Sequence, residues 1–134
     1  MTERIVTRAI IVNENGEVLL GQRARGAGEG QYALIGGKPD EDESMENAVI
    51  REVKEEIGTD FSPSKLWKEH VDTASDSEDP WTVFYYEGKI SGEIELAEDE
   101  VSSVLYVSID SLGSLDVAFN HRDILNEYFS QNYT

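Results

Sequence analysis

The sequence predicts an α+β or α/β/α fold for this chain of 134 residues. Strand-like apolar runs come before and after one amphipathic helical segment, residues 45–57, and a second such segment, 119–129, follows near the C-terminus. The length is enough for a real hydrophobic core and suits a single domain, residues 1–134. We therefore expect one domain in which strands and helices share a core.

The first half of the chain predicts a hairpin and a short strand. Residues 5–12 form the expected first strand, and 17–23 return as the second. The turn between them, 13–16, contains an Asn-Gly pair that supplies positive φ angles. Residues 26–30 form a glycine-rich loop without the order of a phosphate-binding P-loop. A short strand at 32–35 then runs into a pair of glycines.

The helix expected between Ser44 and Gly58 carries most of the chemistry-bearing residues. Ser44 suits an N-cap, and Gly58 supplies the left-handed residue that ends a helix. One side of this helix is apolar and should face a core: Val49, Ile50, Val53 and Ile57. Glu52, Glu55 and Glu56 share another arc, where like charges destabilise an isolated helix. Mg²⁺ would relieve this repulsion because it binds carboxylates together with phosphates; the alternative is a solvated acidic face.

The second half predicts, in order, a strand near 66–71, a polar loop at 72–80, an aromatic-rich strand at 81–90, a segment at 93–96 that pairs back or turns, and a strand at 104–107. The helix at 119–129 would have Asn120 as its cap. Its apolar face would contain Ile124, Leu125, Tyr128 and Phe129.

The composition excludes several classes of protein. Without Cys, neither a disulfide framework nor a thiolate metal site can form. No apolar run approaches roughly eighteen residues, so we expect a soluble, cytoplasmic protein with no membrane partner. The net charge of −17 would repel duplex nucleic acid. It suits a salt-adapted surface or a merely acidic one. The oligomeric state stays open, a homodimer included.

Residues 37–59 contain acidic residues, an arginine and glycines at fixed spacing: Gly37, five residues, Glu43, seven residues, then Arg51-Glu52-Val53-x-Glu55-Glu56-x-Gly58. This spacing resembles the Nudix box, the signature loop–helix–loop of the Nudix hydrolases. Outside the box, residues 21–23 and 105–112 are also similar to segments of the family. The resemblance implies the Nudix fold, a mixed β-sheet between α-helices.

The same resemblance implies an activity and a metal site. The family hydrolyses the pyrophosphate of a nucleoside diphosphate linked to a second moiety, X. Glu52, Glu55 and Glu56 would hold Mg²⁺ or Mn²⁺, with the backbone carbonyl of Gly36 or Gly37 as a further ligand.

Other residues of the box would support this site. Arg51 would pair with Glu43 or a helix carboxylate and orient Glu52, unless it forms only an ordinary surface ion pair. Gly37, Glu43 and Gly58 would shape the box. The general base would be a box glutamate or one of Glu98 and Glu100, which could equally be solvated loop acids.

Substrate choice is less strongly encoded. Arg23 and Arg25 could contact phosphates or form surface ion pairs. Tyr32 could stack a base, although aromatic residues in strands more often build cores. Residues 118–125 are similar to a segment of Nudix enzymes of the ADP-ribose pyrophosphatase type, which favours ADP-ribose or a related nucleotide sugar. The alternatives are a nucleoside triphosphate pyrophosphohydrolase of the MutT type and a non-catalytic nucleotide-sensing module. His70 and His121 have no second ligand at metal spacing and are interpreted as structural or surface residues.

Overall fold

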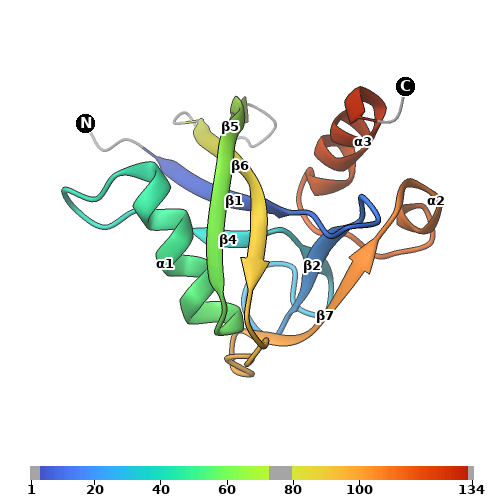
Figure 1. The fold of residues 1–134 in the computed structure, drawn as a ribbon, viewed down its shortest axis with the longest axis horizontal. Coiled ribbons are helices and arrows are strands. Elements are labelled where there is room, and N and C mark those ends of the chain that lie inside the picture. Colours follow the sequence, from blue (N-terminus) through green and yellow to red (C-terminus); the bar gives the residue numbers. More distant parts are fainter. Residues whose placement is uncertain (1–3, 73–79, 133–134) are drawn as a thin grey trace.

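The computed structural model describes residues 4–72 and 80–132. Its elements are, in chain order, β1 (Ile5–Ile11), β2 (Val18–Arg23), β3 (Tyr32–Ala33), β4 (Ile35–Gly37), α1 (Met45–Ile57), β5 (Asp60–Asp72), β6 (Trp81–Ser91), β7 (Val101–Val107), α2 (Ile109–Leu112) and α3 (His121–Asn132) (Figure 1).

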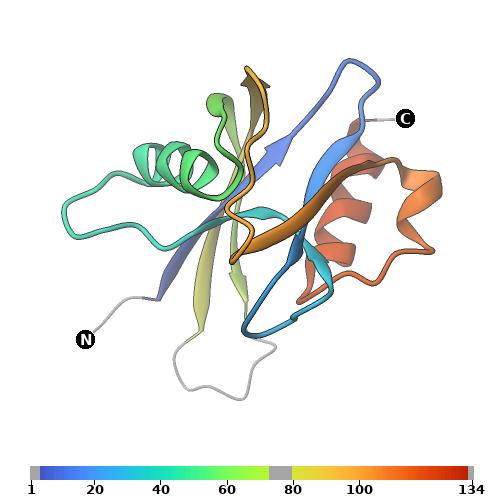
Figure 2. The same cartoon turned by 90° about the horizontal axis from the view of Figure 1, so that it is seen from below.

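The strands divide into two sheets. The first has the order β4-β1-β6-β5 and is mixed, because β1 and β6 run parallel while the other neighbours are antiparallel. The second is antiparallel, with the order β3-β2-β7. Figure 2 shows β2 and β7 to one side of β5 and β6. The α+β class is confirmed, but the strands that the resemblance placed in one mixed sheet form two.

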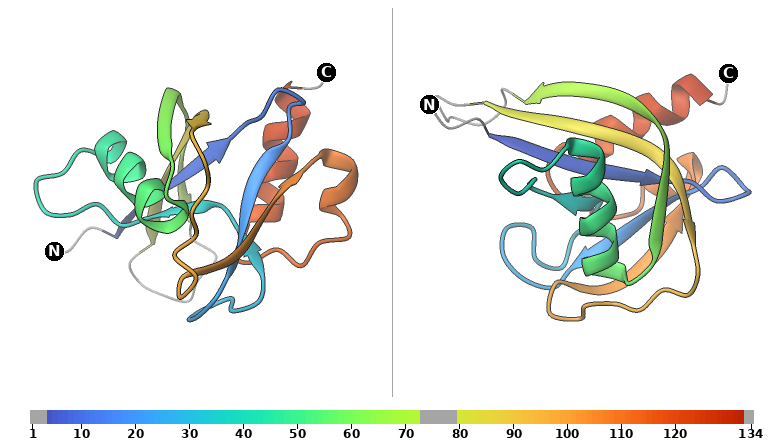
Figure 3. Two further views of the ribbon diagram at one scale, coloured as in Figure 1. Left: turned by 60° about the horizontal axis from the view of Figure 1, so that its bottom comes forward. Right: turned by 60° about the vertical axis from the view of Figure 1, so that its left-hand side comes forward.

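Helices α1 and α3 lie on opposite sides of the strands (Figure 3). Successive side chains of β1 point to opposite faces of the sheet, so this strand packs toward α1 on one face and toward α3 on the other. Ile10 packs in one core with Phe129 of α3. Its neighbours Ala9 and Ile11 face the other way and pack in a second core with Val53 of α1.

Helix α1 begins and ends where the local sequence predicts. The Ser44 hydroxyl accepts a hydrogen bond from the backbone N–H of Asn47 at 3.1 Å. Gly58 adopts φ 73° and its N–H donates to the carbonyl of Lys54 at 3.0 Å. Of the predicted apolar side, Val49, Val53 and Ile57 are fully buried, whereas Ile50 is only partly buried. Local capping and amphipathicity therefore fix this helix and the direction of its carboxylates.

Strand β5 departs most from the sequence-based prediction. A strand was expected near 66–71, but β5 starts at Asp60 and pairs with β6 from Asp60–Ser91 to Asp72–Trp81. The register shifts twice along this ladder, between Pro63 and Lys65 and between Leu66 and Lys68. Such irregularities break the alternation by which a strand is recognised in a sequence, so pairing with β6 determines the length of β5.

Smaller differences concern the C-terminal part. Residues 93–96 make no strand, β7 begins at Val101, and the four-residue helix α2 was not predicted. Helix α3 begins at His121 because Phe119 has a left-handed φ of 57°. Of the predicted loop at 72–80, residues 73–79 lie outside the described residues. No helix in the described ranges is long and apolar enough to cross a membrane.

Candidate active site

Arg51 is the centre of an ion-pair network that joins α1 to the preceding loop. Its Nε donates to Glu43 Oε2 at 2.9 Å, and its Nη2 donates to Glu43 Oε1 at 3.0 Å. Nη2 also donates to the carbonyl of Lys38 at 3.0 Å. Glu43 in turn accepts from the backbone N–H of Asp40 at 2.8 Å. This two-point geometry requires the planar fork of arginine and ties the loop to the helix.

The same guanidinium contacts two of the three predicted metal carboxylates. Nη1 donates to Glu52 at 3.0 Å and to Glu55 at 3.1 Å. The hydrogen bond from Arg51 lowers the pKa of Glu43, and Glu43 is the largest cause of the raised pKa of Arg51. Glu55 is exposed and remains paired with Arg51 on the helix surface.

Two glycines of β4 allow close packing at the site, Gly37 against the Glu52 carboxylate of α1 and Gly36 against the backbone of β1. A Cβ on Gly37 would lie 2.5 Å from Cδ of Glu52, so a larger residue would displace this carboxylate. A Cβ on Gly36 would lie 2.0 Å from the backbone oxygen of Thr7 on β1. The Thr7 hydroxyl donates to the carbonyl of Gly37 at 3.0 Å and fixes its direction. The glycine pair is therefore a steric requirement of the site.

Glu56 is a half-buried residue whose carboxylate charge is only partly compensated, by Arg8. Its Oε2 is buried and has no hydrogen-bond partner among the described groups. Burial, followed by the charge of Glu52, raises its pKa to about 8. Burial also raises the pKa of Glu52. Two neighbouring carboxylates in a partly desolvated site need a shared proton or a cation between them.

Glu52 and Glu56 line a pocket of about 340 Å³, together with Arg23, Arg25, Gly26, Gly36 and Glu100. Arg25 Nη2 lies 3.2 Å from Glu100 Oε1 in an exposed ion pair. Arg23 Nε donates to the carbonyl of Ala27 at 2.6 Å, which holds its side chain against the glycine-rich loop. The pocket therefore combines carboxylates from α1 with guanidinium groups from the end of β2.

This pocket brings together five predicted site residues that are far apart in the sequence: Arg23, Arg25, Glu52, Glu56 and Glu100. Glu98 does not line it and is exposed in the turn before Glu100. Tyr32 packs against the core on the α3 side, with its hydroxyl 3.5 Å from that of Ser103. In the described ranges, no three acidic or histidine side chains form a ready metal cluster, in keeping with the pairing of Glu55 to Arg51.

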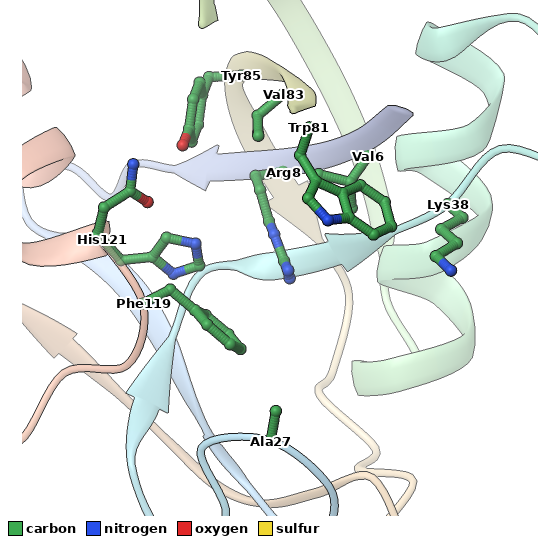
Figure 4. Close-up of a pocket in the computed structure, with 10 residues that line it drawn as sticks. Val6, Arg8, Ala27, Lys38, Trp81, Val83, Tyr85, Phe119 and His121 are labelled. Carbon is green, nitrogen blue, oxygen red and sulfur yellow. The ribbon is translucent and has the colours of Figure 1, made fainter. Parts of the chain in front are cut away.

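A second pocket, of about 380 Å³, lies between β1, β6 and the start of α3 (Figure 4). Its lining residues are Val6, Arg8, Ala27, Lys38, Trp81, Val83, Tyr85, Phe119, Asn120 and His121. The Phe119 ring lies 5.8 Å from the guanidinium carbon of Arg8 and 5.1 Å from that of Arg23. Since Arg8 lines the second pocket and Arg23 the first, Phe119 connects the two pockets.

Sequence reasoning did not find Arg8 or assign a site to His121. The one signal for Arg8 was a cation within the apolar pattern of a predicted buried strand. The one signal for His121 was its place in the segment 118–125, because its contacts come from residues distant in the sequence.

Comparison with known proteins assigns the family. The family model described as the NUDIX domain matches residues 2–128. This chain belongs to the NUDIX family. The predicted family is thereby confirmed, and with it, at family level, an enzyme that hydrolyses pyrophosphate bonds of nucleotides.

Two curated relatives and one solved structure illustrate the range of this NUDIX protein's neighbours. It is 31% identical over 128 residues to the nucleoside triphosphatase NudI of Enterobacter sp. (strain 638), covering 87% of this chain and 90% of the relative. It is 29% identical over 122 residues to the ADP-ribose pyrophosphatase of Methanocaldococcus jannaschii, covering 88% and 69%. The crystal structure of a MutT protein from Methanosarcina mazei Go1 superposes with a TM-score of 0.81 at 26% identity, covering 100% and 99%.

His121, the first residue of α3, is a buried neutral imidazole. Its side chain is 3% exposed, and its Nδ1 accepts the backbone N–H of Leu34 at 3.0 Å. Burial, and then the charges of Arg8 and Arg23, lower its pKa well below the usual value. Because Nδ1 accepts this hydrogen bond, the proton of the neutral His121 ring is on Nε2.

We expect His121 to contribute a stability that is lost in acid. The unfolded chain protonates this residue near pH 6.5, whereas the folded imidazole stays neutral to lower pH. Its contribution to the free energy of unfolding is therefore complete above about pH 7 and falls by about 1.4 kcal/mol per unit as the pH drops below 6.5. Urea unfolding of wild type and His121→Gln between pH 5 and 7.5 measures the difference. Glu56, with its raised pKa, gives the opposite slope in both proteins and cancels in that difference. If the free energy of unfolding of the two proteins changed with pH in parallel, His121 would not be a buried neutral imidazole.

Proposed function

We propose that this protein is a metal-dependent hydrolase that cleaves the pyrophosphate of a nucleoside diphosphate linked to a second moiety, X. The supporting observation is one pocket lined by the half-buried Glu52 and Glu56, with a buried Glu56 Oε2, together with Arg23 and Arg25. Cleavage of a pyrophosphate needs neutralised phosphate oxygens and an oriented water molecule. Carboxylates and guanidinium groups in one pocket suit these two needs.

The carboxylates fit Mg²⁺ or Mn²⁺. The buried Oε2 of Glu56 without a partner and the adjacent Glu52 carboxylate are hard oxygen ligands of the kind these ions prefer. Glu55 would join them on leaving Arg51, and the carbonyl of Gly36 or Gly37 would complete the protein ligands. When bound, the ion supplies charge neutralisation for the phosphates and lowers the pKa of water.

The side chains around this site have distinct roles in the proposal. Arg51 holds Glu52 in place through the network with Glu43. Arg23 and Arg25 bind phosphate oxygens, which requires Arg25 to leave Glu100. The Glu100 carboxylate then becomes available to accept a proton from the attacking water, and its place in the pocket favours it over Glu98.

Two forms of X are consistent with the pocket and the relatives. If X is a sugar, the substrate is ADP-ribose or another nucleotide sugar. The sequence favours this form, and one curated relative is an ADP-ribose pyrophosphatase. If X is a phosphate, the substrate is a nucleoside triphosphate. A second curated relative, a nucleoside triphosphatase, supports this form. A non-catalytic nucleotide sensor is disfavoured because all three box carboxylates are present.

The activity should depend fully on a divalent metal. We expect hydrolysis with millimolar Mg²⁺ of at least one compound in a panel of ADP-ribose, other nucleotide sugars and nucleoside triphosphates. Identification of the products separates the two forms of X. Mg²⁺ should also raise the melting temperature, because a ligand that binds only the folded state stabilises it. Full turnover of dialysed protein in excess EDTA would exclude the mechanism, and nucleotide binding without any product would indicate the sensor.

Glu56→Gln should abolish most of the turnover without unfolding the protein. The substitution keeps the shape of the side chain but removes a metal-binding charge, so kcat should fall by about 100-fold or more. The melting temperature in EDTA should be retained near pH 7, where a pKa of about 8 already leaves Glu56 mostly protonated, and should rise above about pH 8, where Glu52 repels the ionised wild-type carboxylate. Glu46→Gln is the matched control, since Glu46 is exposed on the same helix and does not line the pocket. Full activity of the Glu56 variant would show that this helix does not hold the metal.

Glu100→Gln and Glu98→Gln should separate the candidates for the general base. We expect kcat to fall by about 100-fold for Glu100→Gln, with Mg²⁺ affinity retained, and to change little for Glu98→Gln. Steady-state kinetics and Mg²⁺ titration of both variants give the measurement. If neither variant loses activity, the base is a glutamate of α1.

A further inference from the structure

The second pocket presents hydrogen-bond donors and few acceptors. Its lining includes the cationic side chains of Arg8 and Lys38 and the imidazole of His121. No Asp or Glu occurs among the described residues that line it. In a chain with a net charge of −17, a pocket with two cations and no carboxylate has an unusual composition.

Arg8 is held so that its guanidinium enters this pocket. Its Nη1 donates to the backbone carbonyl of Leu34 at 3.1 Å. Figure 4 shows the side chain extending from β1, with Trp81 on one side and His121 on the other. A guanidinium carries five N–H donors and no acceptor. Within residues 4–72 and 80–132 the Arg8 side chain donates to Leu34, which leaves further donors for a ligand.

His121 adds a second donor to the same pocket. Since its Nδ1 is occupied by the N–H of Leu34, the ring can offer only Nε2–H. An edge-to-face contact with Phe119, with ring centres 5.3 Å apart, holds the imidazole in place. Asn120 also lines the pocket, but its amide both donates and accepts and does not discriminate between ligands.

Trp81 supplies an aromatic wall for a planar ligand. The ammonium of Lys38 lies 4.9 Å from the centre of its ring. A nucleobase that displaces this ammonium would gain a stacking interaction, which depends little on the identity of the base. Stacking on Trp81 would therefore give affinity, and the donors at the edge of the base would give selectivity.

We propose that Arg8 and His121 make this pocket selective for nucleobases with a carbonyl oxygen at C6 of a purine or C4 of a pyrimidine (hypoxanthine, guanine and uracil) over adenine and cytosine, which carry an amino group at that position. In a 6-oxopurine, O6 and N7 are adjacent acceptors that match the arginine fork. Adenine places an amino group beside N7, and cytosine an amino group where uracil has O4, so a donor would face a donor.

This inference rests on the proposed function for its link to catalysis, and it narrows the substrate. Guanine or uracil nucleotide sugars, or the corresponding triphosphates, become the favoured compounds. ADP-ribose, favoured by the sequence, becomes a disfavoured one because of its adenine.

Nucleotide binding without turnover tests the selectivity directly. In Trp67→Phe protein, Trp81 is the one remaining tryptophan. Its fluorescence, titrated in EDTA with inosine, adenosine, uridine and cytidine monophosphates, reports occupancy of the pocket. We expect inosine to bind about tenfold or more tightly than adenosine, and uridine likewise relative to cytidine. Equal or tighter binding of the amino-bearing bases would overturn the proposal.

Two methionine variants assign the selectivity to Arg8. Arg8→Met keeps the aliphatic length and removes the donors, so the inosine-to-adenosine ratio should fall to within about twofold of unity. Arg4→Met is the matched control, because Arg4 lies 5.7 Å from the Trp81 ring but does not line the pocket. It should keep the wild-type ratio. If Arg8→Met does not fold, Arg8→Lys, which keeps the charge and loses the fork, should still reduce the ratio. An unchanged ratio in the folded Arg8 variant would overturn the assignment.

Hydrolysis assays in Mg²⁺ with both the triphosphates and the diphosphate sugars of inosine and adenosine separate this proposal from the proposed function, in which X is a phosphate or a sugar. Selective binding of inosine monophosphate by a protein that hydrolyses no nucleotide supports the pocket assignment and contradicts the enzymatic function. Hydrolysis with an adenine preference supports the function and overturns the pocket assignment.

Discussion

The bidentate pair between Arg51 and Glu43 is the interaction on which the candidate site depends. It fastens the loop before α1 to the helix, and the same guanidinium holds Glu52 and Glu55. Without this cation, the acidic arc of α1 would repel itself and the loop would lose its attachment. The glycine pair of β4 is a second condition, because a side chain at position 37 would occupy the space of the Glu52 carboxylate. Charge and close packing together determine where the carboxylates lie.

The distribution of charge around the pockets contrasts with the rest of this acidic chain. Arg23 and Arg25 enter the carboxylate pocket, and Arg8 enters the second one. Phe119, in a left-handed conformation uncommon for a bulky residue, contacts both Arg8 and Arg23. Its exposed ring and strained backbone are features that accumulate at functional sites. In the proposed function, the cations of the first pocket would bind the phosphates of a nucleotide, and the aromatic-lined second pocket beside it would take the base.

Prediction from the sequence succeeded where the determinants are local. Ser44 and Gly58 define the ends of α1 through their own backbone and side-chain contacts, so the helix was predicted to the residue. Strand β5 was predicted too short because its first half depends on pairing with β6 across two irregularities. The resemblance suggested Glu100 as a site residue. Its place in one pocket with Arg25 and Glu56 depends on how the segment after β6 folds back against the end of α1.

By itself, the sequence determined the family, the helix that bears the carboxylates, and the residues that brace it, because all of these lie within some two dozen consecutive positions. Only the tertiary structure decided that Oε2 of Glu56 is buried without a hydrogen-bond partner in the described part of the chain, and that Glu55 is held by Arg51. It also decided that Arg8 and His121 share one pocket, since β1 and the start of α3 are separated by most of the chain. Burial and long-range proximity set these properties, and neither is encoded in the spacing of neighbouring residues.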